Sequence, residues 1–174
     1  MNNNLDVPFI PLNEIQDAAK RLNDVIRRTP LIELDVGDIV QDERRIFLKL
    51  ENLQKTGSFK LRGAGNAILA QKDNLSTFDL RSKGVFTCSA GNFAQGLAYT
   101  CKQLQVPCTI VVPDNAPQVK VAAIKRHGAT VVDTPYDTWW NVMTTHQYQG
   151  LNGMFIHPVC NRDVIAGKTI YIYI

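Results

Sequence analysis

One lysine of this chain stands in a setting that favours covalent chemistry. Lys60 lies in residues 56–64, TGSFKLRGA, where small residues surround it and Phe59 precedes it. A lysine amine forms a Schiff base with a carbonyl compound when it is uncharged, and burial lowers its pKa toward that state. The alternative is the ordinary solvated surface lysine. The small neighbours Gly57 and Gly63 clear space for a bulky planar group, which favours the covalent role.

A second segment of small residues follows further along the chain. Residues 89–96, SAGNFAQG, lie between an apolar stretch and a helical pattern. Backbone amides at a helix N-terminus bind carboxylates and phosphates. Ser89, Ala90, Gly91 and Asn92 are therefore candidates for holding an anionic substrate. The structural alternative for Asn92 is a plain helix cap, and the two readings are compatible.

Together these segments resemble the threonine/serine dehydratase (ammonia-lyase) family of the pyridoxal-phosphate-dependent, tryptophan-synthase-β-like superfamily. The resemblance runs over about residues 10–167 and covers an N-terminal half only. It implies an α/β fold of pyridoxal-phosphate fold type II with a parallel-sheet, three-layer lobe, here truncated. It also implies pyridoxal 5'-phosphate bound as a covalent Schiff base on Lys60, with Phe59, Asn92 and Asn161 contacting the cofactor.

The same resemblance assigns the substrate carboxylate to Ser89, Ala90, Gly91 and Asn92. Two residues in this region depart from patterns within the family. Phe93 stands where histidine is frequent, which affects substrate detail. Ala90 stands where the racemase branch has a serine, which serves as a second acid/base on the opposite face of the substrate. Because alanine cannot move a proton, the sequence favours elimination over racemisation.

The implied reaction is the β-elimination of a hydroxy amino acid, giving 2-oxobutanoate from L-threonine or pyruvate from L-serine, plus ammonia. Lys60 anchors the cofactor and removes the Cα proton, while the cofactor takes up the charge left on carbon. Three alternatives stay open. They are a serine racemase-like activity, a catalytically inactive dehydratase fragment that serves as an interaction partner, and a plain nucleotide-binding α/β domain. The last lacks its glycine fingerprint, Gly-x-Gly-x-x-Gly.

The resemblance also suggests a domain division. Asn161 lies in residues 157–167, HPVCNRDVIAG, which resemble the segment that leaves the family's small domain; a turn asparagine is the alternative. We expect residues 1–80 to form the N-terminal part of the large domain, carrying the Schiff-base lysine. Residues 81–157 are expected to form a small α/β domain. Residues 158–174 then return to a large domain that is mostly missing.

The spacing of apolar residues predicts strands that alternate with helices. Helices are expected at residues 13–28, 59–71, 92–104, 116–126 and 136–149. Strands are expected at residues 31–34, 45–50, 84–88, 108–112, 129–132 and 154–156. Short strands that alternate with helices argue for a parallel sheet joined by right-handed crossovers.

The C-terminal residues raise two opposed expectations. In the family this region opens a long helix, whereas residues 169–174 are by type uncharged and β-prone. The family's phosphate-holding loop is expected beyond Ile174, so the chain as given should bind pyridoxal phosphate poorly and turn over nothing. The sheet around the strand at 45–50 should lack neighbours and leave an open apolar edge, which promotes aggregation.

Composition narrows the expected partners. The net charge of +3 is small and evenly spread, so a small amino-acid substrate is expected, not nucleic acid or a membrane. No apolar run approaches the roughly 20 residues that span a bilayer. The N-terminus also lacks a signal-peptide pattern, so we expect a cytoplasmic protein with four reduced, mostly buried cysteines. In a longer form we expect a homo-oligomer.

The histidines and tryptophans receive structural roles. The three histidines show no metal-ligand spacing, so no metal site is expected. His127 precedes a glycine at a helix end, where a C-terminal cap is expected. Trp139 and Trp140 are interpreted as packing residues away from the two motifs.

Overall fold

The computed structural model describes residues 9–35, 45–73 and 77–173, without the side chains of residues 72, 73, 77–79 and 171–173. Within these residues, a four-stranded parallel sheet runs in the order β5-β4-β3-β6. The strands are β3 (Val85–Cys88), β4 (Cys108–Pro113), β5 (Thr130–Thr134) and β6 (Met154–Phe155). The helices between them are α4 (Asn92–Leu104), α5 (Gln118–Arg126) and α6 (Tyr136–Thr145), and α3 (Thr77–Lys83) precedes β3.

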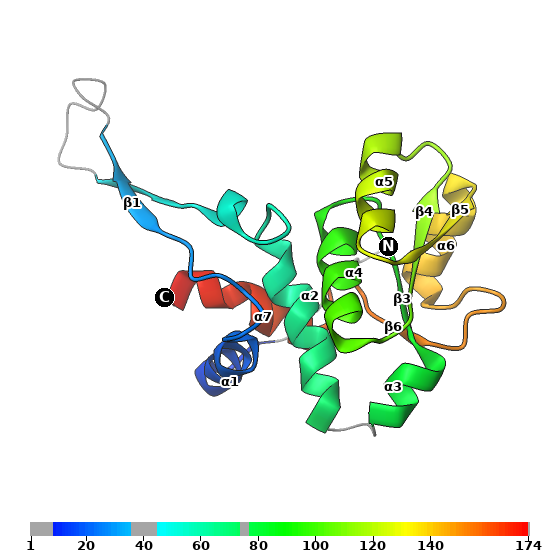
Figure 1. Cartoon of the computed structure of the whole chain (residues 1–174), viewed down its shortest axis with the longest axis horizontal. Helices are drawn as coiled ribbons and strands as arrows, with labels where there is room; N and C mark the ends of the chain where they lie inside the picture. Colours follow the sequence, from blue (N-terminus) through cyan, green and yellow to red (C-terminus); the bar gives the residue numbers. More distant parts are fainter. Residues whose placement is uncertain (1–8, 36–44, 74–76, 174) are drawn as a thin grey trace.

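Alternation along the central strands assigns side chains to the two faces of this sheet. On β4, Ile110 packs with Leu97 of α4 and Ile124 of α5 in the main core cluster. The next residue, Val111, packs on the other face against Val142 of α6. The lobe therefore has three layers, with α4 and α5 on one face and α6 on the other (Figure 1).

A stack of helices lies beside this lobe. Helix α2 (Lys60–Leu69) packs against α4, and α7 (Arg162–Tyr173) packs between α2 and α1 (Leu12–Leu22). Small residues bring the axes close: a Cβ on Gly96 would lie 3.0 Å from the Leu61 Cα, and one on Gly167 would lie 2.5 Å from the Arg62 carbonyl oxygen. Any larger side chain at these two positions would separate the helices.

The first two strands form a separate antiparallel ribbon. Strand β1 (Leu31–Leu34) pairs with β2 (Ile46–Lys49), and the ribbon extends away from the rest of the molecule (Figure 1). Between β2 and α2 lies a short 3₁₀ helix, η2 (Glu51–Leu53), and a second one, η3 (Ala70–Asp73), follows α2. All four residues of β1 are exposed.

Most predicted elements are found, with errors at their ends. The helix expected at 13–28 ends at Leu22, where Asn23 begins a turn. The helix expected at 136–149 ends at Thr145, because His146 adopts a left-handed conformation with φ 63°. Helix α5 begins at Gln118, two residues later than expected. Helix α3 is an element that the apolar pattern did not predict.

The helix that the family resemblance implies at the C-terminus is present, although the residues there are β-prone by type. Residues 162–173 form α7. Ile170 is fully buried in a cluster with Leu22 of α1, and the Thr169 hydroxyl donates to the Ile165 carbonyl within the helix. Tertiary packing thus overrides the β propensity of these side chains. None of the described helices combines the length and apolarity needed to cross a bilayer.

Candidate active site

The order of the parallel strands singles out one place on the sheet. The chain proceeds outward from β3 to β4 and β5, and then crosses back to place β6 on the other side of β3. Ligands in open α/β sheets bind at the carboxyl ends of the strands where the direction reverses. Here that point lies between β3 and β6. The segments that leave these two strands, residues 89–92 and residues 156–161, contain predicted site residues.

Lys60 is brought to this end of the sheet by the packing of α2 on α4. It is the first residue of α2, and its backbone amide donates to the Ser58 hydroxyl at 3.2 Å. A Cβ on Gly96 would touch Leu61, and one on Gly65 would lie 3.6 Å from the Thr100 hydroxyl oxygen. These two contacts have the same offset in sequence, so the helices run parallel. Their N-terminal turns therefore lie at the same end.

Phe59 and Lys60 point toward each other. The Lys60 Nζ lies 4.9 Å from the centre of the Phe59 ring, and both side chains are half-buried. Their location at the start of α2 is consistent with the cofactor role expected of them. That role itself stays a prediction.

The polar groups of the loop between β3 and α4 form few hydrogen bonds within the described structure. Gly91 is the N-cap residue of α4, and no side chain caps the helix. Asn92 is therefore the first helical residue, not the cap that was the alternative reading, and it is exposed. The Ser89 hydroxyl accepts a long hydrogen bond from the Gly91 amide, at 3.4 Å. Ala90 is half-buried against the main core.

Asn161 has a structural task. Its Oδ1 accepts a hydrogen bond from the Val164 amide at 3.0 Å at the start of α7. This is the pattern of a helix N-cap. Asn161 follows β6, next to the strand that carries the Ser89 loop. Its expected contact with the cofactor stays a prediction, because the described contacts of its side chain are with α7.

Sequence reasoning missed Lys168, which lies beside Lys60. Its Nζ donates to the Pro158 carbonyl oxygen at 2.8 Å. Burial, followed by the nearby charge of Lys60 and a hydrogen bond with it, lowers the pKa of Lys168 to about 8. The residues are far apart in sequence, and only the packing of α7 on α2 reveals the contact. No pattern within residues 168–174 indicated it.

A buried ion pair holds α2 against the segment that follows the ribbon. Arg62 is fully buried, and its Nε and Nη2 donate to the two carboxylate oxygens of Glu51 at 2.9 and 2.7 Å. The Thr29 hydroxyl also donates to Glu51. Burial alone would raise the pKa of Glu51, but the hydrogen bonds from Arg62 and Thr29 lower it overall. This network fixes the turn that precedes Lys60.

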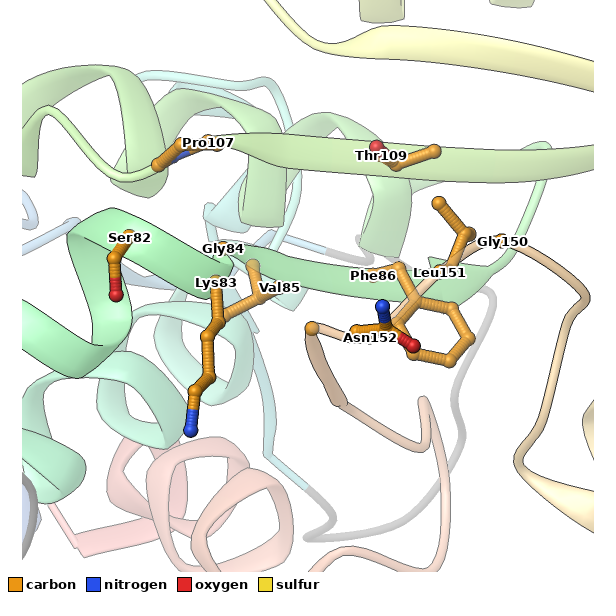
Figure 2. A pocket seen from close by; sticks show the side chains of 11 residues that line it. Ser82, Lys83, Gly84, Val85, Phe86, Pro107, Thr109, Gly150, Leu151 and Asn152 are labelled. Atoms are coloured by element: carbon orange, nitrogen blue, oxygen red, sulfur yellow. The ribbon is translucent and has the colours of Figure 1, made fainter.

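Two hollows lie at the opposite edge of the sheet. One, of about 370 Å³, is lined by residues that precede or begin β3, β4 and β6, including Val85, Pro107 and Asn152 (Figure 2). The other, of about 690 Å³, lies beside the loop of residues 146–153. Both are open at the amino ends of the strands, away from Lys60. The chemistry-bearing residues, not these hollows, therefore define the candidate site.

The remaining predicted roles are partly confirmed. Cys88, Cys101 and Cys108 are buried, Cys160 is exposed, and all four are free thiols. His127 is the C-cap residue of α5, as expected. Trp139 packs against the α6 face of the sheet, and its Nε1 donates to the Val111 carbonyl. The packing role given to Trp140 was wrong, because this side chain is 53% exposed.

Known proteins share this arrangement. The chain is 39% identical over 161 residues to L-threonine dehydratase catabolic TdcB of Staphylococcus aureus, covering 92% of this chain and 45% of that protein. It is equally identical to the serine racemase of Dictyostelium discoideum, covering 91% of this chain and 48% of that protein. The solved structure of this racemase matches with a TM-score of 0.77 at 38% identity, covering 94% of this chain and 52% of the racemase chain.

A solved threonine deaminase, from T.th., matches with a TM-score of 0.78 at 35% identity, covering 93% of this chain and 49% of its own. The present chain thus spans about half the length of these relatives. The predicted pyridoxal-phosphate fold type II is confirmed by these matches. Residues 22–173 match the family described as pyridoxal-phosphate dependent enzyme, and the chain belongs to this family.

Proposed function

We propose that this chain supplies the reactive amine and the carboxylate-holding loop of a pyridoxal-phosphate-dependent ammonia-lyase. The reaction is the β-elimination of L-threonine to 2-oxobutanoate or of L-serine to pyruvate, with release of ammonia. The observation that carries the proposal is the alignment of α2, which begins at Lys60, with the parallel helix α4, so that both N-terminal turns lie at the reversal point of the sheet. The relatives are about twice as long, so turnover is proposed for a protein that contains this chain.

The residues at this edge fit a cofactor with a carbonyl group and acidic groups. Lys60 supplies an amine, Asn92 supplies an exposed amide, and the first amides of α4 have no side-chain cap. A Cβ built on Gly91 meets no atom within 4 Å, so the loop leaves open space beside these donors. When bound there, pyridoxal phosphate supplies an aromatic ring that takes up the electron pair left on the substrate Cα.

In this proposal Lys60 is both the attachment point and the base. As a free amine it takes the proton from Cα, and the β-hydroxyl then leaves as water. The N-terminal amides of α4 and the Ser89 hydroxyl orient the substrate carboxylate, because a helix N-terminus attracts anions. Phe59 packs beside the Lys60 amine and excludes water from one side of it. Asn92 and Asn161 are proposed to contact the cofactor.

Racemisation is the second candidate, since a serine racemase matches the chain as closely as a dehydratase does. Inversion at Cα requires a proton donor on the face opposite Lys60. Ala90, the residue proposed to stand nearest that face, has no hydroxyl. The proposal therefore favours elimination over racemisation.

The third candidate is a non-catalytic fragment that serves as a binding partner. Its support is the ribbon of β1 and β2, which exposes large apolar side chains on a chain half as long as its relatives. Enzyme and fragment differ in whether Lys60 reacts with the cofactor and whether turnover follows.

Two measurements test the proposal. The chain is incubated with pyridoxal phosphate and reduced with borohydride, and peptide mass spectrometry then locates the added mass. We expect labelling at Lys60, weak because the chain is expected to hold the phosphate poorly. The exposed Lys55 is the internal control. Equal labelling of both lysines would contradict a selective site.

The second measurement uses a chimera in which this chain replaces the matching segment of the Staphylococcus aureus dehydratase. We expect 2-oxo acid release from L-threonine or L-serine, and a loss of several orders of magnitude on Lys60→Ala. A chimera with Ala90→Ser should gain racemase activity, measured by chiral chromatography. Turnover that survives Lys60→Ala would overturn the proposed role of this lysine.

A further inference from the structure

A second amine is built into the site beside Lys60. The aliphatic part of Lys168 lies over α2, because a Cβ on Gly63 would be 2.9 Å from the Lys168 Cγ. Its Nζ donates to the Pro158 carbonyl oxygen and lies near enough to Lys60 for the two charges to interact. Because Gly63 has no side chain, the Lys168 side chain of α7 can lie against the first turn of α2.

The surroundings of this pair do not neutralise two positive charges. The groups that face Lys168 are Lys60 from α2, together with Cys160 and His157 from the segment that precedes α7. Within the described residues, neither amine forms an ion pair with a carboxylate. Two neighbouring ammonium groups repel each other, so one of them loses its proton at a lower pH than an isolated lysine does. Burial of Lys168 acts in the same direction.

We propose that Lys168 is the proton acceptor for Lys60. When the Lys60 ammonium gives up its proton, one N–H bond at Lys60 breaks and one N–H bond at Lys168 forms, so the total charge is unchanged. The lone pair freed on Lys60 is then the nucleophile for a carbonyl carbon. The Pro158 carbonyl accepts a hydrogen bond from the new ammonium and holds it in place. This role rests on the proposed function, since it serves the reaction of Lys60 with an aldehyde.

The coupling of the two amines is tested without any cofactor. Trace acetylation with acetic anhydride is followed across the titration range of lysine, and mass spectrometry gives the rate at each residue. We expect Lys168 to reach half of its maximal rate near pH 8. With Lys60→Met this midpoint should move upward, because the neighbouring charge is gone. The exposed Lys125 is the internal reference, and the control variant Lys55→Met should leave the midpoint unchanged.

The transfer itself is tested by the rate at which pyridoxal phosphate becomes trapped on Lys60 by borohydride. We expect Lys168→Met to slow this rate at least severalfold above about pH 8, where Lys168 is largely uncharged and can accept a proton, and to shift the pH profile upward. Lys168→Arg keeps the charge and length but cannot accept a proton, so it should not rescue the rate.

An ordinary lysine midpoint for Lys168, about 10.4, or no response to Lys60→Met, would overturn the inference and leave the proposed function intact. The inference also fails if Lys168→Arg reacts as fast as the unmodified chain. Absence of trapping at Lys60 with a normal acetylation result would instead count against the proposed function. Circular dichroism of each variant identifies any that fail to fold, and Lys60→Gln then replaces Lys60→Met.

Discussion

The two sheets of this molecule differ in how they bury their side chains. In the parallel lobe, all four residues of β3 are buried, and helices cover both faces. In the ribbon, β1 and β2 contain similar apolar residues but no layer covers them within the described structure. Leu31, Ile32 and Phe47 are 56%, 44% and 47% exposed. Apolar side chains therefore stabilise the parallel sheet by burial, whereas in the ribbon they form an exposed apolar surface.

The difference shows where the candidate site obtains its rigidity. Lys60 lies between the two regions, at the start of a helix whose other side is part of the main core. The position of Lys60 depends on α4 and α7, not on the ribbon. Its helix, α2, closely contacts α4 at Gly96 and α7 at Gly167. Catalytic geometry should therefore respond to changes in the lobe and helix stack, and little to changes in the ribbon.

The largest expected difference is between two isoleucines. Ile110→Ala empties a fully buried position of β4 and should lower the free energy of unfolding by about 3–4 kcal/mol. Ile32→Ala, in the exposed ribbon, should lower it by less than about 1 kcal/mol. Urea unfolding is followed by fluorescence, with the half-buried Trp139 as a reporter in the lobe. Equal losses for the two variants would show that the ribbon is buried in solution.

A second pair of variants compares two carboxylates. Glu51→Gln removes the charge opposite the fully buried Arg62, and its side chain is only 12% exposed. The loss in unfolding free energy should be about 3 kcal/mol, because a buried guanidinium is left without its counter-charge. Glu33 forms an equally short pair with Arg45 on the ribbon, but both side chains are solvated. Glu33→Gln should therefore leave the urea midpoint unchanged within error.

The Glu51 pair should also weaken in acid. The pKa of Glu51 is lowered in the folded chain, so its stabilisation is complete above the unfolded pKa, about 4.3, and disappears as pH falls through the folded value. The stability difference between the unmodified chain and Glu51→Gln should hold from neutral pH down to about 5 and shrink below about 4. Urea midpoints of both proteins, measured along this series, give the difference. If the stability difference stayed constant across this pH range, the charge of the Glu51 carboxylate would not be the cause of the stabilisation.

Local sequence patterns predicted helices and strands well where the apolar positions of the pattern are also the buried positions. The helix at Lys60 and strands β1, β3 and β4 were within two residues of their observed bounds, because apolar periodicity directly reflects which face is buried. The end at Thr145 was missed because a left-handed histidine leaves no mark in that periodicity. The tail helix could not be derived from residue type, because its buried face depends on contacts with α1.

The site was predictable only in part, for the same reason. Lys60 and the loop of residues 89–92 could be proposed as site residues because each has a local motif of small residues. Lys168 has no such motif, and its proximity to Lys60 arises from the packing of two helices distant in sequence. The Glu51–Arg62 pair is also invisible in sequence, because a charged residue in a strand–helix connection is usually solvated.

The last prediction combines a small change in stability with a clear effect on association, and it concerns the ribbon. Unpaired strand edges with apolar side chains promote contact between chains. Phe47→Lys places a charge on β2 and should increase the monomeric fraction in light scattering, while the unfolding free energy changes by no more than about 0.5 kcal/mol. The matched control is Val119→Lys, which changes a 75% exposed apolar residue on α5. Because a single exposed side chain on a helix offers no unpaired backbone, this control should not alter association. If the two variants suppress association equally, the net charge of the chain, and not the ribbon edge, governs association.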